Sequence, residues 1–456
     1  MGFNISLETS VLAVVMITSF LAPFMGSAIN LAIPAIGAEF GGSTLILSWV
    51  VSGYLLASAA FLLPFGRLAD IVGRKKILLT GIFLFTCFAL LAGMAWSMES
   101  LLFFRLGQGI ATSMIFSTGM AIITSVYPSH KRGRAIGLNA SAVYVGLSLG
   151  PVIGGFMTHY LGWRSIFYFA ALAGIFAALI CVWRLNGEWA DAKGEHFDFT
   201  GSACYIVAVT AMLYGLSAAS NSIWGKGSLG VGLAFTAIFL VYEAKQEYPI
   251  FHVNLFRRNT VFALSNLAAM INYSATFAVG FLVSLFLQTI AGYDAHVSGM
   301  ILLSQPLIMA VFSPFTGALS DRIEPRIVAS CGMGTSTLGL FAFTFVTPQT
   351  SPWLVIANLI IIGLGFALFA SPNNNAIMGS VEKIFYGVAA STLSTARLFG
   401  QAISMAIVSL VLSVYLGDAS LSPEHSAMLM ASFRSAFIIF TVLCLGGVFA
   451  SLARGK

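Results

Sequence analysis

The chain has 456 residues, of which 58% are hydrophobic and only 8% are charged, and its mean hydropathy is +0.94. This composition excludes a soluble globular protein, whose surface needs far more charged side chains. The net charge of +6 indicates membrane topology and contact with anionic lipid, and we expect no nucleic-acid binding.

Apolar windows long enough to cross a bilayer recur along almost the whole chain. The hydrocarbon core is about 30 Å thick and takes about 20 residues of helix, whereas an open strand edge would leave backbone polar groups unpaired in lipid. We therefore predict an all-α membrane protein. Fourteen spans are expected, at Val11–Ile36, Ile46–Phe65, Ile77–Trp96, Leu101–Val126, Ala135–Met157, Ile166–Val182, the weaker Thr200–Ala218 and Ser228–Tyr242, and Thr260–Gln288, Val297–Leu319, Ile327–Val346, Trp353–Ala370, Tyr386–Leu416 and Ser435–Ala453.

The loops that connect these spans are alternately rich and poor in Lys and Arg. If the N-terminus is cytoplasmic, most of the 22 Lys and Arg lie in cytoplasmic loops or in the C-terminal tail, and only Arg164, Lys226 and Arg434 lie outside. Short cytoplasmic loops retain cations. We predict a multi-pass protein of the cell membrane with both termini in the cytoplasm.

Two loops carry the same charge pattern. The stretch "GRLADIVGR" from Gly66 follows the second span, and "GALSDRIEPR" from Gly317 follows the tenth, each with Asp four residues after Gly. A second pair of segments, 133–146 and 387–400, is separated by nearly the same number of residues. The chain therefore reads as a six-helix N-terminal half (1–185), two inserted helices (198–243) and a six-helix C-terminal half (258–456).

The fourth and fifth spans carry polar and small residues at helical spacings. In "RLGQG", Arg105 and Gln108 share one helix face. A buried arginine in a membrane needs polar partners or water, although Arg105 could instead extend to the outer interface. In "GLSLGPVIGG", small residues allow close helix packing and a proline bends the helix; this motif comprises Gly146, Gly150, Pro151, Gly154 and Gly155.

Polar side chains within several spans are candidates for lining a midplane cavity. Arg397 stands out because it lies near the middle of a long span, where a cation indicates a functional site. The candidate substrate-binding residues are Asn30, Tyr54, Asn139, Tyr144, Asn266, Tyr273, Gln305, Asn358, Arg397 and Gln401. Each one alone could equally make a hydrogen bond between helices.

On these motifs the chain resembles the major facilitator superfamily, in particular its fourteen-helix drug:proton antiporters. The resemblance implies a major facilitator fold and export of drug-like compounds in exchange for protons by alternating access. It also implies roles for the motif residues: Arg105 and Gln108 in proton coupling, the glycines and proline of the fifth span as an antiporter motif, and a cytoplasmic gate latch formed by Gly66, Asp70, Gly73, Arg74, Lys75, Asp321 and Arg322. The alternative for the loop lysines is that they only obey the charge rule for cytoplasmic loops.

One position departs from that family. Fourteen-helix drug exporters commonly carry an aspartate in the first span where this chain has Met25. A desolvated cationic drug without a counter-charge is costly, and Arg105 and Arg397 would make a cavity positive. We expect neutral or anionic amphipathic substrates; the alternatives are a general drug exporter and an exporter of an anionic metabolite or lipid-like compound without proton coupling.

The chain lacks the motifs that mark ATP-driven transporters and metal-dependent hydrolases. There is no Gly-x-x-x-x-Gly-Lys-Ser/Thr loop for ATP and no HExxH for a hydrolase, and the five cysteines lie at unrelated spacings. A channel fits a duplicated gate loop less well than alternating access does. We expect no enzyme activity, no cofactor and no metal, and a monomer whose partners are a small-molecule substrate, protons and membrane lipid.

Overall fold

The computed structural model describes residues 7–41, 43–127, 129–185, 187–190, 192–218, 223–251, 253–320, 323–381, 386–417 and 425–454. Within these ranges the chain is helical and contains no strand. The predicted gate residues Asp321 and Arg322 lie outside the described residues.

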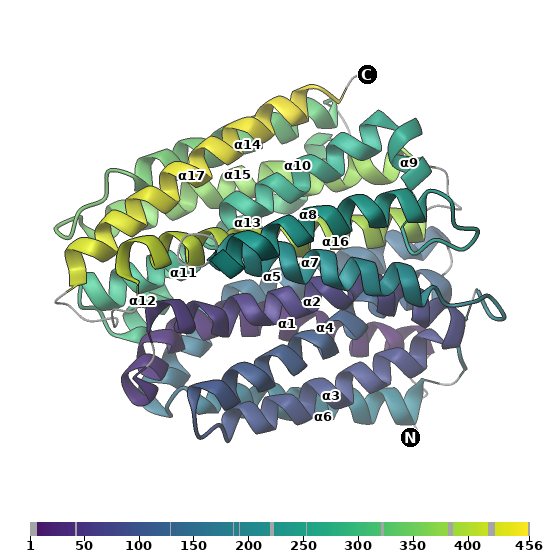
Figure 1. The fold of residues 1–456 in the computed structure, drawn as a ribbon, viewed down its shortest axis with the longest axis horizontal. Helices are drawn as coiled ribbons and strands as arrows, with labels where there is room; N and C mark the ends of the chain where they lie inside the picture. The colour runs from purple at the N-terminus through teal and green to yellow at the C-terminus, as the bar shows by residue number, and fades with distance from the viewer. Residues whose placement is uncertain are drawn as a thin grey trace.

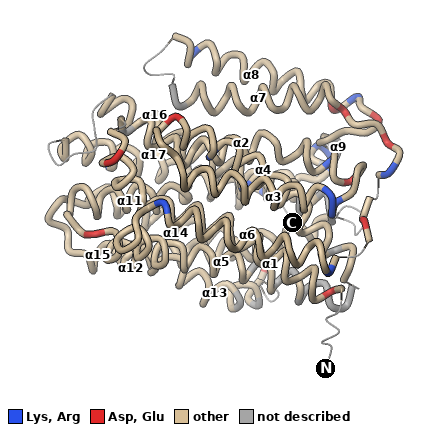
Figure 2. The backbone as a smooth tube through the Cα atoms, turned by 90° about the horizontal axis from the view of Figure 1, so that it is seen from below, with Lys and Arg blue, Asp and Glu red and all other residues tan. Residues whose placement is uncertain are grey.

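Six long helices make up the N-terminal half. They are α1 (Leu7–Phe40), α2 (Thr44–Val72), α3 (Arg74–Gly93), α4 (Met98–Val126), α5 (Ser129–Tyr160) and α6 (Arg164–Arg184). The inserted pair is α7 (Phe199–Ala218) and α8 (Ile223–Glu243), followed by the short α9 (Val253–Arg258). In Figures 1 and 2 the pair lies along one side of the bundle, where α7 packs on α2 and on α16 (Tyr386–Leu416) of the other half.

The C-terminal half has more elements because two of its spans are interrupted. Its other helices are α10 (Thr260–Thr276), α11 (Val279–Leu285), the π-helix Phe286–Ile290, α12 (Ala295–Leu302), α13 (Ser304–Ser320), α14 (Pro325–Phe343), α15 (Pro352–Gly379) and α17 (Ser426–Leu452). The halves meet where α5 packs on α12 and α13, where α2 packs on α16, and where α1 packs on α11.

Both interruptions have local causes. Between α10 and α11 the amide of Ala278 donates to the hydroxyl of Ser404, 3.0 Å away, instead of continuing the helix. Between α12 and α13 the chain turns at Leu303, because Pro306 has no amide hydrogen for the carbonyl of Leu302 and its ring crowds that carbonyl. The spans expected over Thr260–Gln288 and Val297–Leu319 are therefore not single regular helices.

Length and composition identify a multi-pass membrane protein. Thirteen helices in the described part of the chain are long and apolar enough to cross a membrane. The helix α14, at the expected eleventh span, is not among them, because its sequence "CGMGTSTLG" is rich in small and polar residues. Fourteen crossings remain a prediction.

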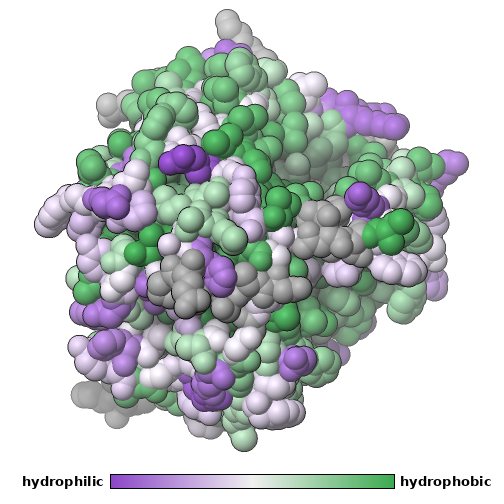
Figure 3. Space-filling model, turned by 60° about the vertical axis from the view of Figure 1, so that its left-hand side comes forward, coloured by the Kyte–Doolittle hydropathy of each residue, from purple (hydrophilic) through white to green (hydrophobic). Residues whose placement is uncertain are grey.

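Charge lies at the ends of the bundle. Figure 2 shows Lys and Arg concentrated at the end beside α9, with few charges in between, and Figure 3 shows large hydrophobic areas beside an end where hydrophilic residues mix in. The first residues of α1 and the last of α17 lie at the same end as α9 (Figure 1). This end is the one that the loop charges predict to be cytoplasmic.

Candidate functional site

A cavity lies between the two halves, and it offers about 110 Å³ to the centres of water molecules. The N-terminal half contributes α1 and α5, and the C-terminal half contributes α10 to α13, α15 and α16. The described lining residues carry no charge; they are Gly26, Ser27, Asn30, Leu147, Pro151, Tyr273, Thr276, Phe277, Gly280, Leu302, Gln305, Pro306, Met309, Phe366 and Gln401. A mostly apolar wall with a few amides and hydroxyls suits an amphipathic ligand.

Four of the predicted substrate-binding residues line this cavity: Asn30, Tyr273, Gln305 and Gln401. The side-chain oxygen of Asn30 is buried and has no hydrogen-bond partner.

The other predicted side chains lie elsewhere. The hydroxyl of Tyr54 is 2.9 Å from that of Thr112 on α4, and the amide of Asn266 donates to the carbonyl of Phe262 one turn earlier in its own helix. Asn139 is buried within α5, and Asn358 is partly exposed on α15. None of these residues lines the cavity.

Arg397 lies behind the wall rather than in it. Its guanidinium interacts with the hydroxyl of the wall residue Tyr273 and electrostatically with Tyr144, and it lies 5.8 Å from the ring centre of Phe116 in the other half. Tyr144 packs with Met309 and Tyr273 beside the cavity. Arg397 therefore contacts a residue of the cavity wall, Tyr273, without lining the cavity itself.

Arg105 is fully buried and does not extend to the interface. Its Nη1 donates to the side-chain oxygen of Gln108 at 2.6 Å, and its Nε donates to the carbonyl of Val50 at 3.0 Å. The guanidinium carbon also lies 4.2 Å from the ring centre of Tyr54, a cation–π distance. The remaining nitrogen, Nη2, has no partner.

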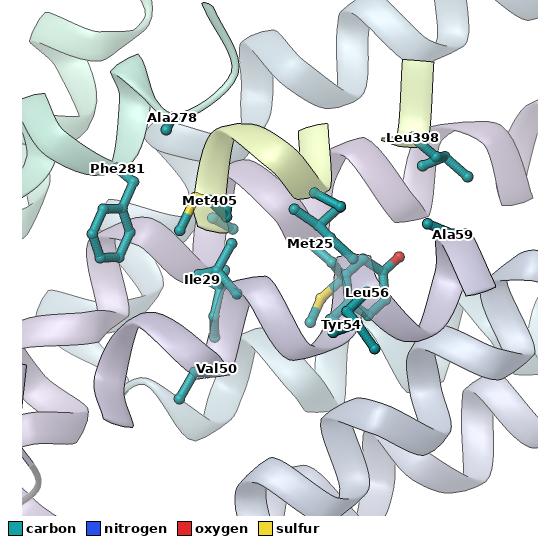
Figure 4. Close-up of a cluster of buried hydrophobic side chains, with 14 of the residues drawn as sticks. Met25, Ile29, Val50, Tyr54, Leu56, Ala59, Ala278, Phe281, Leu398 and Met405 are labelled. Atoms are coloured by element: carbon teal, nitrogen blue, oxygen red, sulfur yellow. The ribbon is translucent and has the colours of Figure 1, made fainter. Parts of the chain in front are cut away.

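Met25, which stands where an acid was expected, is also fully buried. It belongs to a core cluster with Leu56 and Tyr54 of α2 (Figure 4). It does not line the cavity. A carboxylate there would be placed among apolar side chains.

The motif of α5 uses two faces of one helix. A Cβ added at Gly146, Gly150 or Gly154 would collide with α1, so this face closes the N-terminal half. Added at Gly155, it would collide with the carbonyl of Ala295, and the carbonyl of Pro151 in turn crowds Gly299. The second face therefore packs against the other half at backbone distance.

The gate loop between α2 and α3 forms a compact polar network. Arg74 donates from Nε to Asp70 at 2.8 Å and from Nη1 to the hydroxyl of Ser125, near the end of α4, at 2.9 Å. Gly73 joins the two helices at φ +128°, a conformation that favours glycine. At Gly66, by contrast, a Cβ would meet Ser117 at an ordinary contact distance of 3.5 Å, so the packing there does not require glycine.

A segment between α6 and α7 covers this loop. The sequence analysis did not predict this contact. The amide of Arg74 donates to the carbonyl of Trp189 at 2.8 Å, and the amide of Ala192 donates to the carbonyl of Asp70 at 3.0 Å. The side chain of Glu188 accepts from the amide of Lys75 at 2.7 Å, and Arg67 forms an ion pair with Glu195. The charge-rich stretch "GEWADAKGEHFD" was the available signal.

The sequence is similar to those of known membrane transporters. The sequence pattern of the Major Facilitator Superfamily matches residues 15–268 and 265–455. The chain is 30% identical over 440 residues to the riboflavin transporter RibZ of Clostridioides difficile (strain 630), which covers 96% of this chain and 95% of the relative. It is also 30% identical over 401 residues to the multidrug resistance protein Stp of Mycobacterium tuberculosis (strain CDC 1551 / Oshkosh), covering 87% and 74%.

Among solved structures, the chain resembles a bacterial homologue of the human lysosomal transporter Spinster in an inward-facing, unoccupied conformation. The TM-score is 0.71 at 16% identity, and the match covers 99% of this chain and 98% of the other. The overall fold is thus shared with that structure.

Proposed function

The chain belongs to the Major Facilitator Superfamily, and from this premise we propose that it exports small amphipathic compounds across the cell membrane in exchange for protons. The observation that carries the proposal is the uncharged cavity between the halves, lined from both of them. A midplane site shared by two repeats is the arrangement that alternating access requires.

The contacts between the halves support a rocking motion. On the side of the cavity away from the gate loop, the hydroxyls of Ser48 and Ser409 lie 2.7 Å apart, and Ser284 donates to the carbonyl of Asn30, a cavity residue, at 2.9 Å. The Gly155 and Gly299 contacts lie on the same side. With both termini in the cytoplasm, as the loop charges predict, this side would be the outer one, and these contacts would close the cavity to the exterior.

Opening to the exterior would break these contacts and would require a counterpart at the inner end. We assign that part to the latch of Asp70 and Arg74: its described contacts, to each other and to Ser125 of α4, lie within the N-terminal half, and closing the inner end would bring the latch against the C-terminal half. The ion pair is partly exposed and contributes little to stability. Its role is in the conformational equilibrium.

The substrate class follows from the wall of the cavity. The described lining has no carboxylate for a multivalent cation, and the cation Arg397 contacts the wall residue Tyr273. This arrangement favours neutral or anionic compounds. The relatives named as a riboflavin transporter and as a multidrug resistance protein are consistent with organic cargo. Arg397 also supports the second candidate, export of an anionic metabolite.

We assign a part in proton coupling to Arg105 and Gln108: neither side chain exchanges a proton at neutral pH, so the pair would respond to a proton bound elsewhere in the protein. Their bond is buried, and the free Nη2 of Arg105 leaves a polar group that a change of state could engage. A buried charge whose partners change is costly enough to drive a conformational change.

A susceptibility panel in a host lacking its own pumps tests the substrate class. The wild type is compared with Arg397→Ala and Met25→Asp, using anionic, neutral and dicationic compounds. We expect Arg397→Ala to lose export of anionic compounds selectively. Strong resistance of the wild type to dicationic dyes, unchanged in Arg397→Ala, contradicts the assignment.

A further inference from the structure

The base of the inserted pair holds two carboxylates that the transport cycle does not use. Asp198 precedes α7 and Glu243 ends α8. Glu243 is only 2% exposed. One of its oxygens accepts from the amide of Phe251 at 3.0 Å, and the other, Oε1, is buried without a partner.

Asp198 likewise has one hydrogen-bonded carboxylate oxygen and one without a partner. Its Oδ1 accepts from the amide of Gly201 at 2.8 Å and from the hydroxyl of Tyr242 at 3.2 Å, whereas its Oδ2 is buried without a partner. A Cβ placed on Gly201 would collide with both unpartnered oxygens at once. The two oxygens therefore share one small space beside Gly201.

Two ionised carboxylates cannot share such a space at low cost. Like charges held close and away from water favour the state in which one group is neutral, and each orphaned buried oxygen carries its own penalty. One shared proton lowers both costs, because it removes one of the two charges and gives one oxygen beside Gly201 an O–H that can turn toward the other.

We propose that Asp198 and Glu243 bind one proton between them, forming a protonation site outside the cavity that is linked to the gate loop. This inference does not depend on the substrate or on proton-coupled transport.

The link runs through Arg67 of α2. Arg67 forms an ion pair with Glu195, in the segment that covers the gate loop, and it also interacts electrostatically with Glu243. Its Nε is buried and has no partner. Among the described residues, the charged and titratable groups that face Asp198 and Glu243 are Arg67 from α2 and Tyr242 from α8. When the pair loses its proton, its second negative charge draws Arg67 away from Glu195 and loosens the segment.

Infrared spectroscopy of the full-length protein in lipid tests the proton directly. We expect the wild type at neutral pH to show a C=O stretching band of a protonated carboxylic acid that is absent in Glu243→Gln. The control Glu195→Gln, which removes a carboxylate from the ion pair with Arg67, should keep the band. In the wild type alone, raising the pH should replace the band with carboxylate absorbance. Absence of a band that depends on Glu243 overturns the proposal.

Hydrogen exchange of residues 70–76 tests the link. Glu243→Gln mimics the protonated side chain, so the ratio of wild-type to variant exchange at each pH cancels the intrinsic pH dependence of exchange. We expect a ratio near one at low pH that rises several-fold as the pair deprotonates. A ratio that stays at one while the infrared band disappears refutes the link. A melting temperature that rises with added Na⁺ or Ca²⁺ in the wild type but not in Glu243→Gln identifies a metal-ion site and also overturns the proposal.

Discussion

Gly26 offers a direct test of the cavity, because the first atom of a side chain can be added there without displacing a neighbour. Gly26 lines the cavity from α1, and a Cβ placed on it meets nothing within 4 Å. We predict that Gly26→Leu folds and inserts normally but transports poorly. Gly26→Ala should have a much smaller effect on transport.

The expected effect of Gly26→Leu on stability is small and favourable, whereas its expected effect on ligand affinity is a loss. Leucine is more favourable than glycine in a helix interior by roughly 1 kcal/mol, so the substitution should not lower stability. Its side chain adds four carbon atoms to a cavity with about 110 Å³ for water centres. A drug-sized ligand gains about 0.3 kcal/mol per atom, so excluding about five ligand atoms costs about 1.5 kcal/mol, or roughly tenfold in affinity.

The assay is transport of a fluorescent substrate into or out of proteoliposomes, with thermal unfolding of the same preparations. Gly446→Leu is the matched control, because Gly446 is also helical and also has open space at its Cβ but lies exposed on α17. Undiminished transport by folded Gly26→Leu would refute the assignment of the cavity. An equal loss in Gly446→Leu would show that the effect is not specific to it.

Three further outcomes follow from the other contacts. Asp70→Asn should reduce transport strongly while membrane abundance and melting temperature stay near wild type, since the partly exposed pair is worth at most about 1 kcal/mol; normal flux through this variant would exclude the latch. Flux in proteoliposomes should respond to an imposed pH gradient and not to sodium, and the reverse result would identify a different coupling ion. Gly155→Val should disrupt the contact with Ala295, so that a cysteine introduced on α5 reacts with an impermeant thiol reagent added on the outer side. An introduced cysteine that stays unreactive in this variant would contradict the proposed closure.

Periodicity predicted local relations in the site well. Arg105 and Gln108 were expected on one face, and they form a hydrogen bond. Their other partners could not be predicted, because the contact between Arg105 and the carbonyl of Val50 depends on where α2 crosses α4. The sequence also could not settle whether Arg105 is buried, since it lies close to the start of its helix.

Helix rotation limited the prediction of the cavity. Tyr54 and Asn30 are both buried, polar and in the N-terminal half, yet Tyr54 faces α4 and Asn30 faces the cavity. A helix that is apolar all round gives little signal for its orientation. Asn266 shows a second limit, because its amide is satisfied by its own backbone, an option that side-chain type alone does not reveal.

The cover over the gate loop was missed for a different reason. The segment from Glu188 to Glu195 has no regular periodicity, and its contacts include main-chain bonds to Arg74 and Asp70. Main-chain bonds do not depend on residue type. A charge-rich loop with acids facing a basic motif was the one sequence signal for it.

The unequal lining of the cavity has a consequence for how such a protein can diversify. Most of the wall comes from the C-terminal half, whereas Arg105 and the described gate network lie in the N-terminal half. Mutations that reshape the wall at Gln305, Met309 or Phe366 therefore leave those N-terminal contacts untouched. Recognition of a new compound can therefore evolve on one half while the contacts to which we assign coupling and gating, on the other half, stay under purifying selection.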